Sequence, residues 1–206
     1  MATVEQDVIE QGPGVRHAPA SSTGPRFRGV HHLVLNTDDI KTTIDFYSGV
    51  LNMPLINAMK VPAGVNRGNP PFERLRHYFF DMGHDSMLAF FELPKGAKDQ
   101  ADRDGVAAMQ HVSLSVTPEE MDKLVERLDA AGVDRLGPFE AAPGCYSCYF
   151  YDPHGIRLEA SYQEADGDDQ KIINGFTQTR AKMLEELRTV TDDEEWLDWA
   201  SSALRA

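Results

Sequence analysis

The sequence predicts an α+β protein made of two tandem βαβββ units, followed by C-terminal helices. Two segments open with histidine and continue with strand-like alternation, His32-Leu-Val-Leu-Asn-Thr and His111-Val-Ser-Leu-Ser-Val. Each is followed by a stretch with apolar residues at helical spacing and then by strand-like runs. The last run of each unit carries a glutamate, Glu92 or Glu159. Such an internal repeat predicts that the two units share one fold.

The repeat divides the chain into five parts. We expect a flexible arm over residues 1–28, which are rich in small and turn-forming residues and lack periodicity. The first βαβββ unit covers 29–93, a charged linker covers 94–107, and the second unit covers 108–163. The remaining part, 164–206, has apolar residues at helical spacing and is predicted to be helical.

The first unit is predicted to begin with a strand over Val30–Asn36, whose side chains alternate between two faces. Thr37 or Asp38 can then cap a helix. The loop Val61–Pro71 is longer than a median connection, so we expect it to be a lid over the functional site. Three further strands are expected at Leu55–Lys60, Leu75–Asp81 and Met87–Glu92.

The second unit repeats this order with clearer signals. The segment Thr117-Pro118-Glu119-Glu120 is a capping box with proline at the first helical position. Gly132 is placed to end that helix. Its three further strands are expected at Leu136–Phe139, Tyr146–Tyr151 and Ile156–Ser161.

The helical tail contains a further capping box, Thr191-Asp-Asp-Glu194. Two helices have no core of their own. We therefore expect the tail to pack on the βαβββ body or on a second subunit, and we expect a homodimer.

Composition excludes several classes of partner. The net charge of −13 argues against nucleic acid and anionic membrane surfaces, which select basic patches. No apolar run approaches the roughly 20 residues that span a bilayer. Without a signal-like N-terminal stretch and with only two cysteines, the expected location is the cytoplasm. We expect a small-molecule substrate.

Strand alternation separates an apolar face from a polar face in the second unit. Because Val112 and Leu114 must pack on the helix, His111 and Ser113 face the other way, into a cup between the units. Imidazole and carboxylate groups suit a divalent first-row metal. The matching positions in the two repeats predict one metal ion per chain, with the candidate ligands His32, His111, Glu159 and Glu92.

Neighbouring residues carry less specific interpretations. His31 adjoins His32, but alignment of the repeats matches His31 with Gln110, which favours His32 as the ligand. Tyr78, Phe90 and Ser113 are candidate substrate-binding residues, although Tyr78 and Phe90 also suit an ordinary sheet core. We expect three other histidines to be turn or surface residues: His77, His84 and His154.

Residues 29–162 resemble the vicinal oxygen chelate superfamily, which includes glyoxalase I, extradiol dioxygenases and fosfomycin or bleomycin resistance proteins. The motifs that carry the resemblance are His32 with the residues after it, Phe90-Phe91-Glu92, His111-Val-Ser-Leu, and Asp152-Pro-His-Gly followed by Glu159. The resemblance implies a curved mixed sheet around a metal cup. It also implies a substrate that chelates the metal through two neighbouring oxygens.

The resemblance implies two main reaction classes. In a glyoxalase-like lyase or isomerase, all four ligands hold Ni²⁺, Co²⁺, Zn²⁺ or Mn²⁺, and Glu92 moves a proton next to a carbonyl. In an extradiol-type dioxygenase, Fe²⁺ is held by the two histidines and Glu159, and Tyr149 has the spacing of the family's active-site tyrosine.

The sequence favours the lyase or isomerase slightly, because residues 139–147 lack the histidine expected of a dioxygenase. A third class, a resistance protein that sequesters a ligand without catalysis, fits less well with a complete ligand set.

Overall fold

The computed structural model describes residues 29–60, 75–97, 102–106, 108–142, 144–163 and 177–203. The chain forms two compact units, and the larger one, Arg28–Glu164, contains both predicted repeats. The expected N-terminal arm and the expected lid Val61–Pro71 lie outside the described residues.

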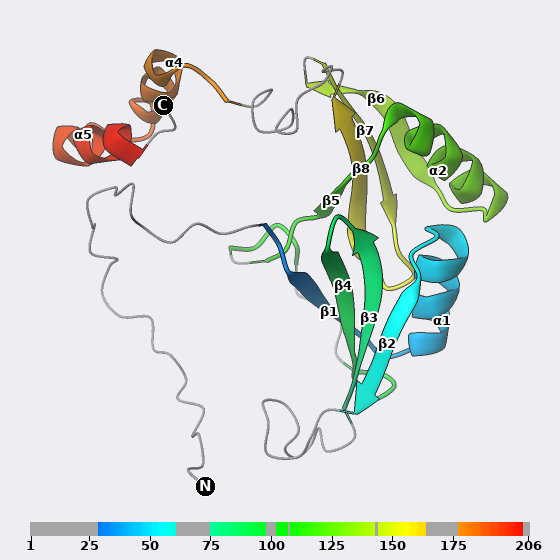
Figure 1. The fold of residues 1–206 in the computed structure, drawn as a ribbon. Helices are drawn as coiled ribbons and strands as arrows, with labels where there is room; N and C mark the ends of the chain where they lie inside the picture. Colours follow the sequence, from blue (N-terminus) through cyan, green and yellow to red (C-terminus); the bar gives the residue numbers. More distant parts are fainter. Residues whose placement is uncertain are drawn as a thin grey trace, which may run out of the picture. The chain divides into compact units, whose positions relative to one another are not determined.

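The first repeat folds in the predicted order. It contains β1 (His32–Thr37), α1 (Ile40–Ile44) continuing into the π-helical segment η1 (Asp45–Val50), and then three strands. The helix is capped by Asp39, whose carboxylate accepts a hydrogen bond from the Thr42 amide, one residue later than the expected cap. The sheet order is β1-β4-β3-β2, with β1 parallel to β4 (Figure 1). The three later strands are β2 (Leu55–Lys60), β3 (Arg76–Gly83) and β4 (Ser86–Glu92).

The second repeat has the same topology. Strand β5 (Val112–Ser115) leads into α2 (Pro118–Ala130), and the sheet order is β5-β8-β7-β6. The predicted helix signals are confirmed, because Thr117 caps α2 and Gly132 follows it with a φ of +67°. Its other strands are β6 (Arg135–Ala142), β7 (Cys145–Tyr151) and β8 (Arg157–Gln163).

Both repeats bury the same kind of face. Figure 1 shows α1 and α2 on one side of the two sheets. On that side the apolar residues of both sheets form one core with the helices. The opposite face of the second sheet is polar, as the alternation predicted. Members of the core include Tyr47, Phe80, Leu88, Phe90, Met121, Leu128, Phe150 and Leu158.

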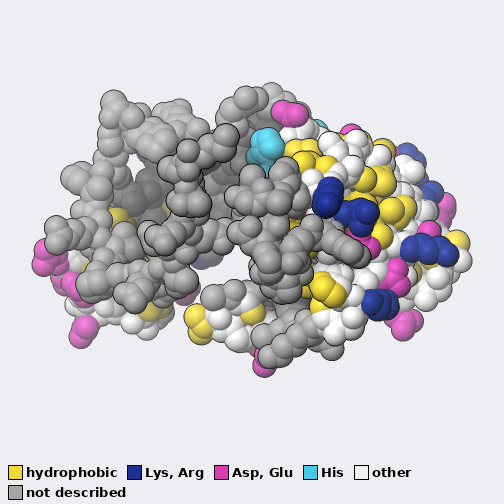
Figure 2. Space-filling model, turned by 90° about the horizontal axis from the view of Figure 1, so that it is seen from below, with side chains coloured by type: hydrophobic (Ala, Val, Ile, Leu, Met, Phe, Trp, Pro, Cys, Tyr) yellow, Lys and Arg dark blue, Asp and Glu magenta, His cyan; other side chains and the backbone are white. Residues whose placement is uncertain are grey.

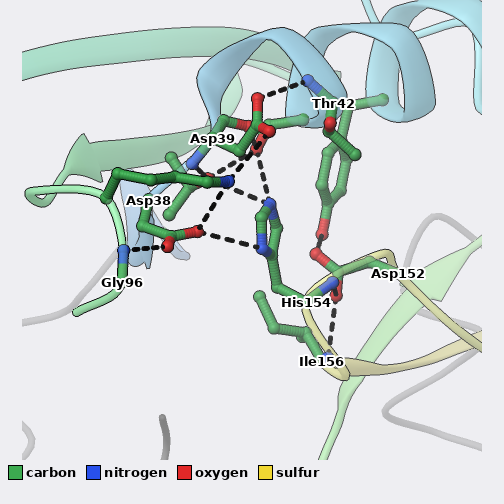
Figure 3. A network of polar contacts seen from close by, with 11 residues as sticks. Asp38, Asp39, Thr42, Gly96, Asp152, His154 and Ile156 are labelled. Carbon is green, nitrogen blue, oxygen red and sulfur yellow. Dashed lines mark hydrogen bonds and ion pairs between the residues drawn. The ribbon is translucent and has the colours of Figure 1, made fainter. Parts of the chain in front are cut away.

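A polar network also joins the two repeats (Figure 3). The Tyr47 hydroxyl donates a hydrogen bond to Asp152 Oδ2 over 3.1 Å. The His154 Nε2 atom lies 3.0 Å from the hydroxyl oxygens of both Thr37 and Thr43. The expectation that His154 is a simple turn residue was therefore incomplete, because its imidazole lies between the β7–β8 turn and the first repeat.

Surface composition differs between strands. All six residues of β2 are exposed, and they include Leu55, Ile56 and Met59. Figure 2 shows hydrophobic side chains reaching the surface of the described part between groups of both charges. The net negative charge is thus not concentrated on the face that Figure 2 shows.

The second compact unit contains α4 (Arg180–Leu187) and α5 (Glu194–Ala203). The predicted helical tail is confirmed in part, although α5 is capped by Asp193, which accepts a hydrogen bond from the Trp196 amide. Thr191, the expected cap, instead accepts a hydrogen bond from the Asp193 amide. None of the helices in the described ranges is long and apolar enough to cross a membrane.

Candidate metal centre

The polar face of the second sheet brings four predicted site residues together. Ser113 on β5 is paired with Glu159 on β8, and Glu159 is paired with Tyr149 on β7. Residues paired across adjacent strands point to the same side of the sheet. His111 precedes β5, and its Nε2 atom lies 2.9 Å from Glu159 Oε2. The structure therefore places His111, Ser113, Glu159 and Tyr149 on one face.

Glu159 is a buried carboxylate with several hydrogen-bond donors. Ser161 Oγ donates to Glu159 Oε1 over 2.9 Å, and the Ser161 hydroxyl is itself 3.1 Å from that of Ser147. Burial raises the pKa of Glu159, but hydrogen bonds from Ser147, Tyr149 and Ser161 together hold it below its ordinary value. Glu159 is thus held ionised at neutral pH, as a metal ligand must be.

Tyr149 is held in its protonated form at the same place. Burial raises the pKa of its phenol, and the hydrogen bond to Glu159 raises it further. The phenol can therefore donate a proton in a hydrogen bond at neutral pH. Its ring centroid lies 6.1 Å from that of His111, in an edge-on arrangement.

The first sheet presents His32 on the face away from the core. His32 is paired with Met87, and its ring lies edge-on to Phe79, with centroids 6.2 Å apart. The Nδ1 atom of His31 lies 2.8 Å from that of His32, so both imidazoles occupy this end of β1. His32 is the member of the pair that belongs to the strand.

Glu92 lies apart from His32. In the register of β1 and β4, His32 is opposite Met87, whereas Glu92 is opposite Thr37 at the far end of the strand pair. Five residues of strand correspond to about 16 Å. The Glu92 carboxylate instead accepts a hydrogen bond from the Tyr78 hydroxyl over 2.7 Å, on the core side of the sheet.

The register also identifies the true counterpart of Glu159. Glu159 is paired with Ser113, two residues after His111, and Ala89 is paired with Val34, two residues after His32. Ala89 therefore occupies the position in the first repeat that Glu159 occupies in the second. The equivalence of Glu92 with Glu159, on which the four-ligand prediction depended, does not match the strand register.

Two of the expected substrate-binding residues belong to the core. Phe90 is fully buried, with its ring centroid 5.0 Å from that of Tyr47. Tyr78 is 8% exposed and bonded to Glu92, and burial together with this hydrogen bond raises the pKa of Tyr78 to about 12. Ser113 is the one of the three that lies on the polar face.

His77 is a feature of the first sheet that the sequence interpretation missed. Its ring lies between Phe91 and Phe79, with centroid distances of 4.1 and 4.2 Å. Burial lowers the pKa of His77, and the nearby His32 lowers it further. Its Nε2 atom is buried and has no hydrogen-bond partner among the described residues. The sequence did contain a signal for this contact, because strand alternation places residues 77 and 79 on the same face of β3.

The structure brings together two of the four predicted ligands, His111 and Glu159, whereas His32 and Glu92 lie apart from them. Within the described ranges, no three His, Cys, Asp or Glu side chains are close enough to hold one metal ion. His111 and Glu159 are in contact, and their donor atoms fit a divalent first-row metal. His32 presents the same chemistry on the corresponding face of the other sheet.

Residues 29–160 match the family model of the Glyoxalase/Bleomycin resistance protein/Dioxygenase superfamily. The chain belongs to this superfamily. Its two βαβββ repeats are consistent with the fold of this superfamily. Comparison with curated proteins gives no match.

Solved structures of the superfamily resemble the chain in fold. A glyoxylase/bleomycin resistance protein/dioxygenase domain from Frankia sp. EAN1pec is 21% identical, with a TM-score of 0.56, covering 68% of this chain and 100% of that one. A glyoxalase family protein from Enterococcus faecalis is 17% identical, with a TM-score of 0.53, and the match covers 66% and 98%. The fosfomycin resistance protein FosX from Listeria monocytogenes is 21% identical, with a TM-score of 0.50, and the match covers 68% and 98%.

Proposed function

We propose that this superfamily member is a divalent-metal-dependent enzyme whose metal is held by His32, His111 and Glu159. The observation that carries the proposal is the pair of His111 and Glu159, 2.9 Å apart and supported by the hydroxyl groups around them. Ligating carboxylates are commonly oriented by such outer hydrogen bonds. The substrate is a small molecule that chelates the metal through two neighbouring oxygens.

The proposed ligand set has three members because Glu92 is bonded to Tyr78 on the core side, and Ala89 stands at the position equivalent to Glu159. Two histidines and one carboxylate are typical of non-haem Fe²⁺ oxygenases. This favours extradiol-type ring cleavage over the glyoxalase-like lyase or isomerase, which would need Glu92 as its proton-transferring ligand.

Each group then has a defined task. A bound Fe²⁺ would supply Lewis-acid chemistry and open positions for the substrate and O₂. Tyr149 would keep its hydroxyl proton and donate it in a hydrogen bond to Glu159, which orients that carboxylate toward the metal. Ser113 would add a second hydroxyl on the same face.

We further propose that the active protein is a homodimer in which His32 of one copy completes the site of the other. His111 and Glu159 lack a third ligand among the described residues of their own chain. The exposed strand β2, with Ile56 52% exposed, also offers an apolar edge for a second chain. We expect this dimer in the cytoplasm.

A mixture of two inactive variants tests the shared site. If His32→Ala and Glu159→Ala proteins are unfolded together and refolded, each mixed dimer should contain one intact site when ligands come from two chains. We expect metal binding to return in the mixture and to be absent from either variant alone. A mixture that binds no metal would show that all ligands come from one chain.

The reaction class is tested with catechol as the probe and an oxygen electrode. We expect Fe²⁺-loaded protein to consume O₂ in the presence of catechol, and Tyr149→Phe to slow this consumption. Turnover of a ketoacid-type or hemithioacetal probe without O₂ uptake would support the lyase or isomerase. Tight probe binding without any turnover would support a ligand-sequestering protein.

A further inference from the structure

Arg157 is placed beside the candidate metal centre by the strand register. It opens β8 two residues before Glu159, so the two side chains share the polar face. Its Cζ atom lies 4.7 Å from the ring centroid of Tyr149, the same tyrosine whose hydroxyl is bonded to Glu159. One tyrosine ring therefore connects the guanidinium group to the ligand carboxylate.

A second arginine repeats this arrangement on the neighbouring ring. Arg103 Cζ lies 5.0 Å from the ring centroid of Tyr151, and Tyr151 is paired with Arg157 across β7 and β8. Cation–π contacts fix guanidinium groups while leaving their N–H donors free. Tyr149 and Tyr151 thus hold two cations at one end of the polar face.

Neither guanidinium is neutralised by a carboxylate in the described part of the chain. The ion pairs found there use other cations, such as Arg135 with Asp129. An arginine that is held in place next to a ligand-binding face, with no acidic partner among the described residues, is suited to bind an anionic group of the ligand.

We propose that Arg157, assisted by Arg103, binds a carboxylate of the substrate, so that the substrate is an anionic chelator. This inference rests on the proposed metal-dependent function. The two-residue separation of Arg157 and Glu159 corresponds to about 6.6 Å along the strand. Because both side chains leave the same face of the strand, a ring whose neighbouring oxygens reach the metal can present a carboxylate to Arg157. The planar fork of arginine suits a carboxylate in two parallel hydrogen bonds.

Two probes that differ only in the carboxylate test the proposal. Co²⁺-loaded protein is titrated with catechol and with 3,4-dihydroxybenzoate, and binding is followed by the Co²⁺ absorption spectrum. We expect the carboxylate-bearing probe to bind at least about tenfold more tightly, because it gains a charge-assisted hydrogen bond. Arg157→Gln should remove this preference and leave the affinity for catechol unchanged, and Arg157→Lys should restore part of it.

Arg76→Gln is the matched control, because Arg76 also opens a strand, β3, but lies on the core side of the first sheet. It should keep the full preference for the carboxylate. Equal affinity of the unmodified protein for both probes would overturn the proposal. So would an Arg157→Gln variant that weakens both probes equally, since Arg157 would then act only by supporting Tyr149 and Glu159.

A titration of metal-free protein with benzoate separates this proposal from the proposed function. Benzoate carries the carboxylate without the chelating oxygens. Binding of benzoate that is lost in Arg157→Gln would support the anion site even if no metal bound to the protein. Absence of benzoate binding to both the metal-free and the Co²⁺-loaded protein would overturn it.

Discussion

Each repeat of this protein contains a tyrosine hydrogen-bonded to a glutamate, and the two pairs differ in the face of the sheet that holds them. Tyr78 and Glu92 meet on the core side of the first sheet, whereas Tyr149 and Glu159 meet on the polar side of the second. Neighbouring positions on a strand face opposite sides of the sheet. One pair therefore stabilises the fold, whereas the other lies at the candidate site. Residue type alone therefore does not identify a ligand.

The largest expected effect is loss of metal binding on replacement of His111. His111→Ala removes the imidazole that contacts Glu159, and we expect affinity for Co²⁺ to fall more than 100-fold in equilibrium dialysis. His84→Ala is the control, because His84 lies in the β3–β4 turn. Full metal occupancy in His111→Ala would contradict the assignment of His111 as a ligand.

The next effect concerns the contact that joins the repeats. His154→Ala removes the imidazole near the hydroxyl groups of Thr37 and Thr43, and its side chain is only 18% exposed. We expect the free energy of unfolding in urea to fall by about 2 kcal/mol. Lys95→Ala, which removes an exposed ion pair with Asp39, should leave the free energy of unfolding nearly unchanged. Equal effects would show that the network does not hold the repeats together.

Replacement of Tyr149 should weaken metal binding and leave the stability of the fold nearly unchanged. Tyr149→Phe deletes a hydrogen bond to Glu159 and should weaken metal affinity about tenfold, the lower end of outer-ligand effects. Thermal unfolding should be nearly unchanged, because Tyr149 lies outside the core. A large loss of stability with unchanged metal affinity would reverse the roles assigned to the two tyrosines.

Removal of the core tyrosine should show the opposite behaviour. Tyr78→Phe should lower the free energy of unfolding by about 1 kcal/mol at neutral pH and leave metal affinity unchanged. The pKa of Tyr78 is raised from 10.0 to about 12, so the folded state favours the protonated phenol. Its contribution is complete below pH 10 and is lost as the pH rises through 12.

Urea unfolding between pH 9 and 12 measures this difference. The unmodified protein should lose stability more steeply than Tyr78→Phe above pH 10. Parallel curves for the two proteins would contradict the assignment.

The repeat and the period-two alternation were sufficient to predict the fold. Apolar side chains at alternate positions of β5 and β8 dictated which face meets α2, and the capping residue Thr117 fixed where that helix begins. The pair of His111 and Glu159 followed from the same reasoning. Local signals of this kind need no knowledge of distant parts of the chain.

These local signals could not predict the register between β1 and β4. Glu92 and Glu159 both lie in the last strand-like run of their repeat, which suggested that they are equivalent, but the pairing between strands decides which positions correspond. The contacts of His154 with Thr37 and Thr43 depend on packing between residues more than 100 positions apart. Such contacts leave no periodic pattern in the sequence.

The metal content of two matched glutamate variants distinguishes a three-ligand site from a four-ligand site. Glu159→Gln and Glu92→Gln each replace one carboxylate by an amide of the same shape. We predict that Glu92→Gln keeps one divalent ion per chain by elemental analysis after dialysis against Co²⁺, whereas Glu159→Gln keeps almost none. Metal loss in Glu92→Gln equal to that in Glu159→Gln would contradict the three-ligand site.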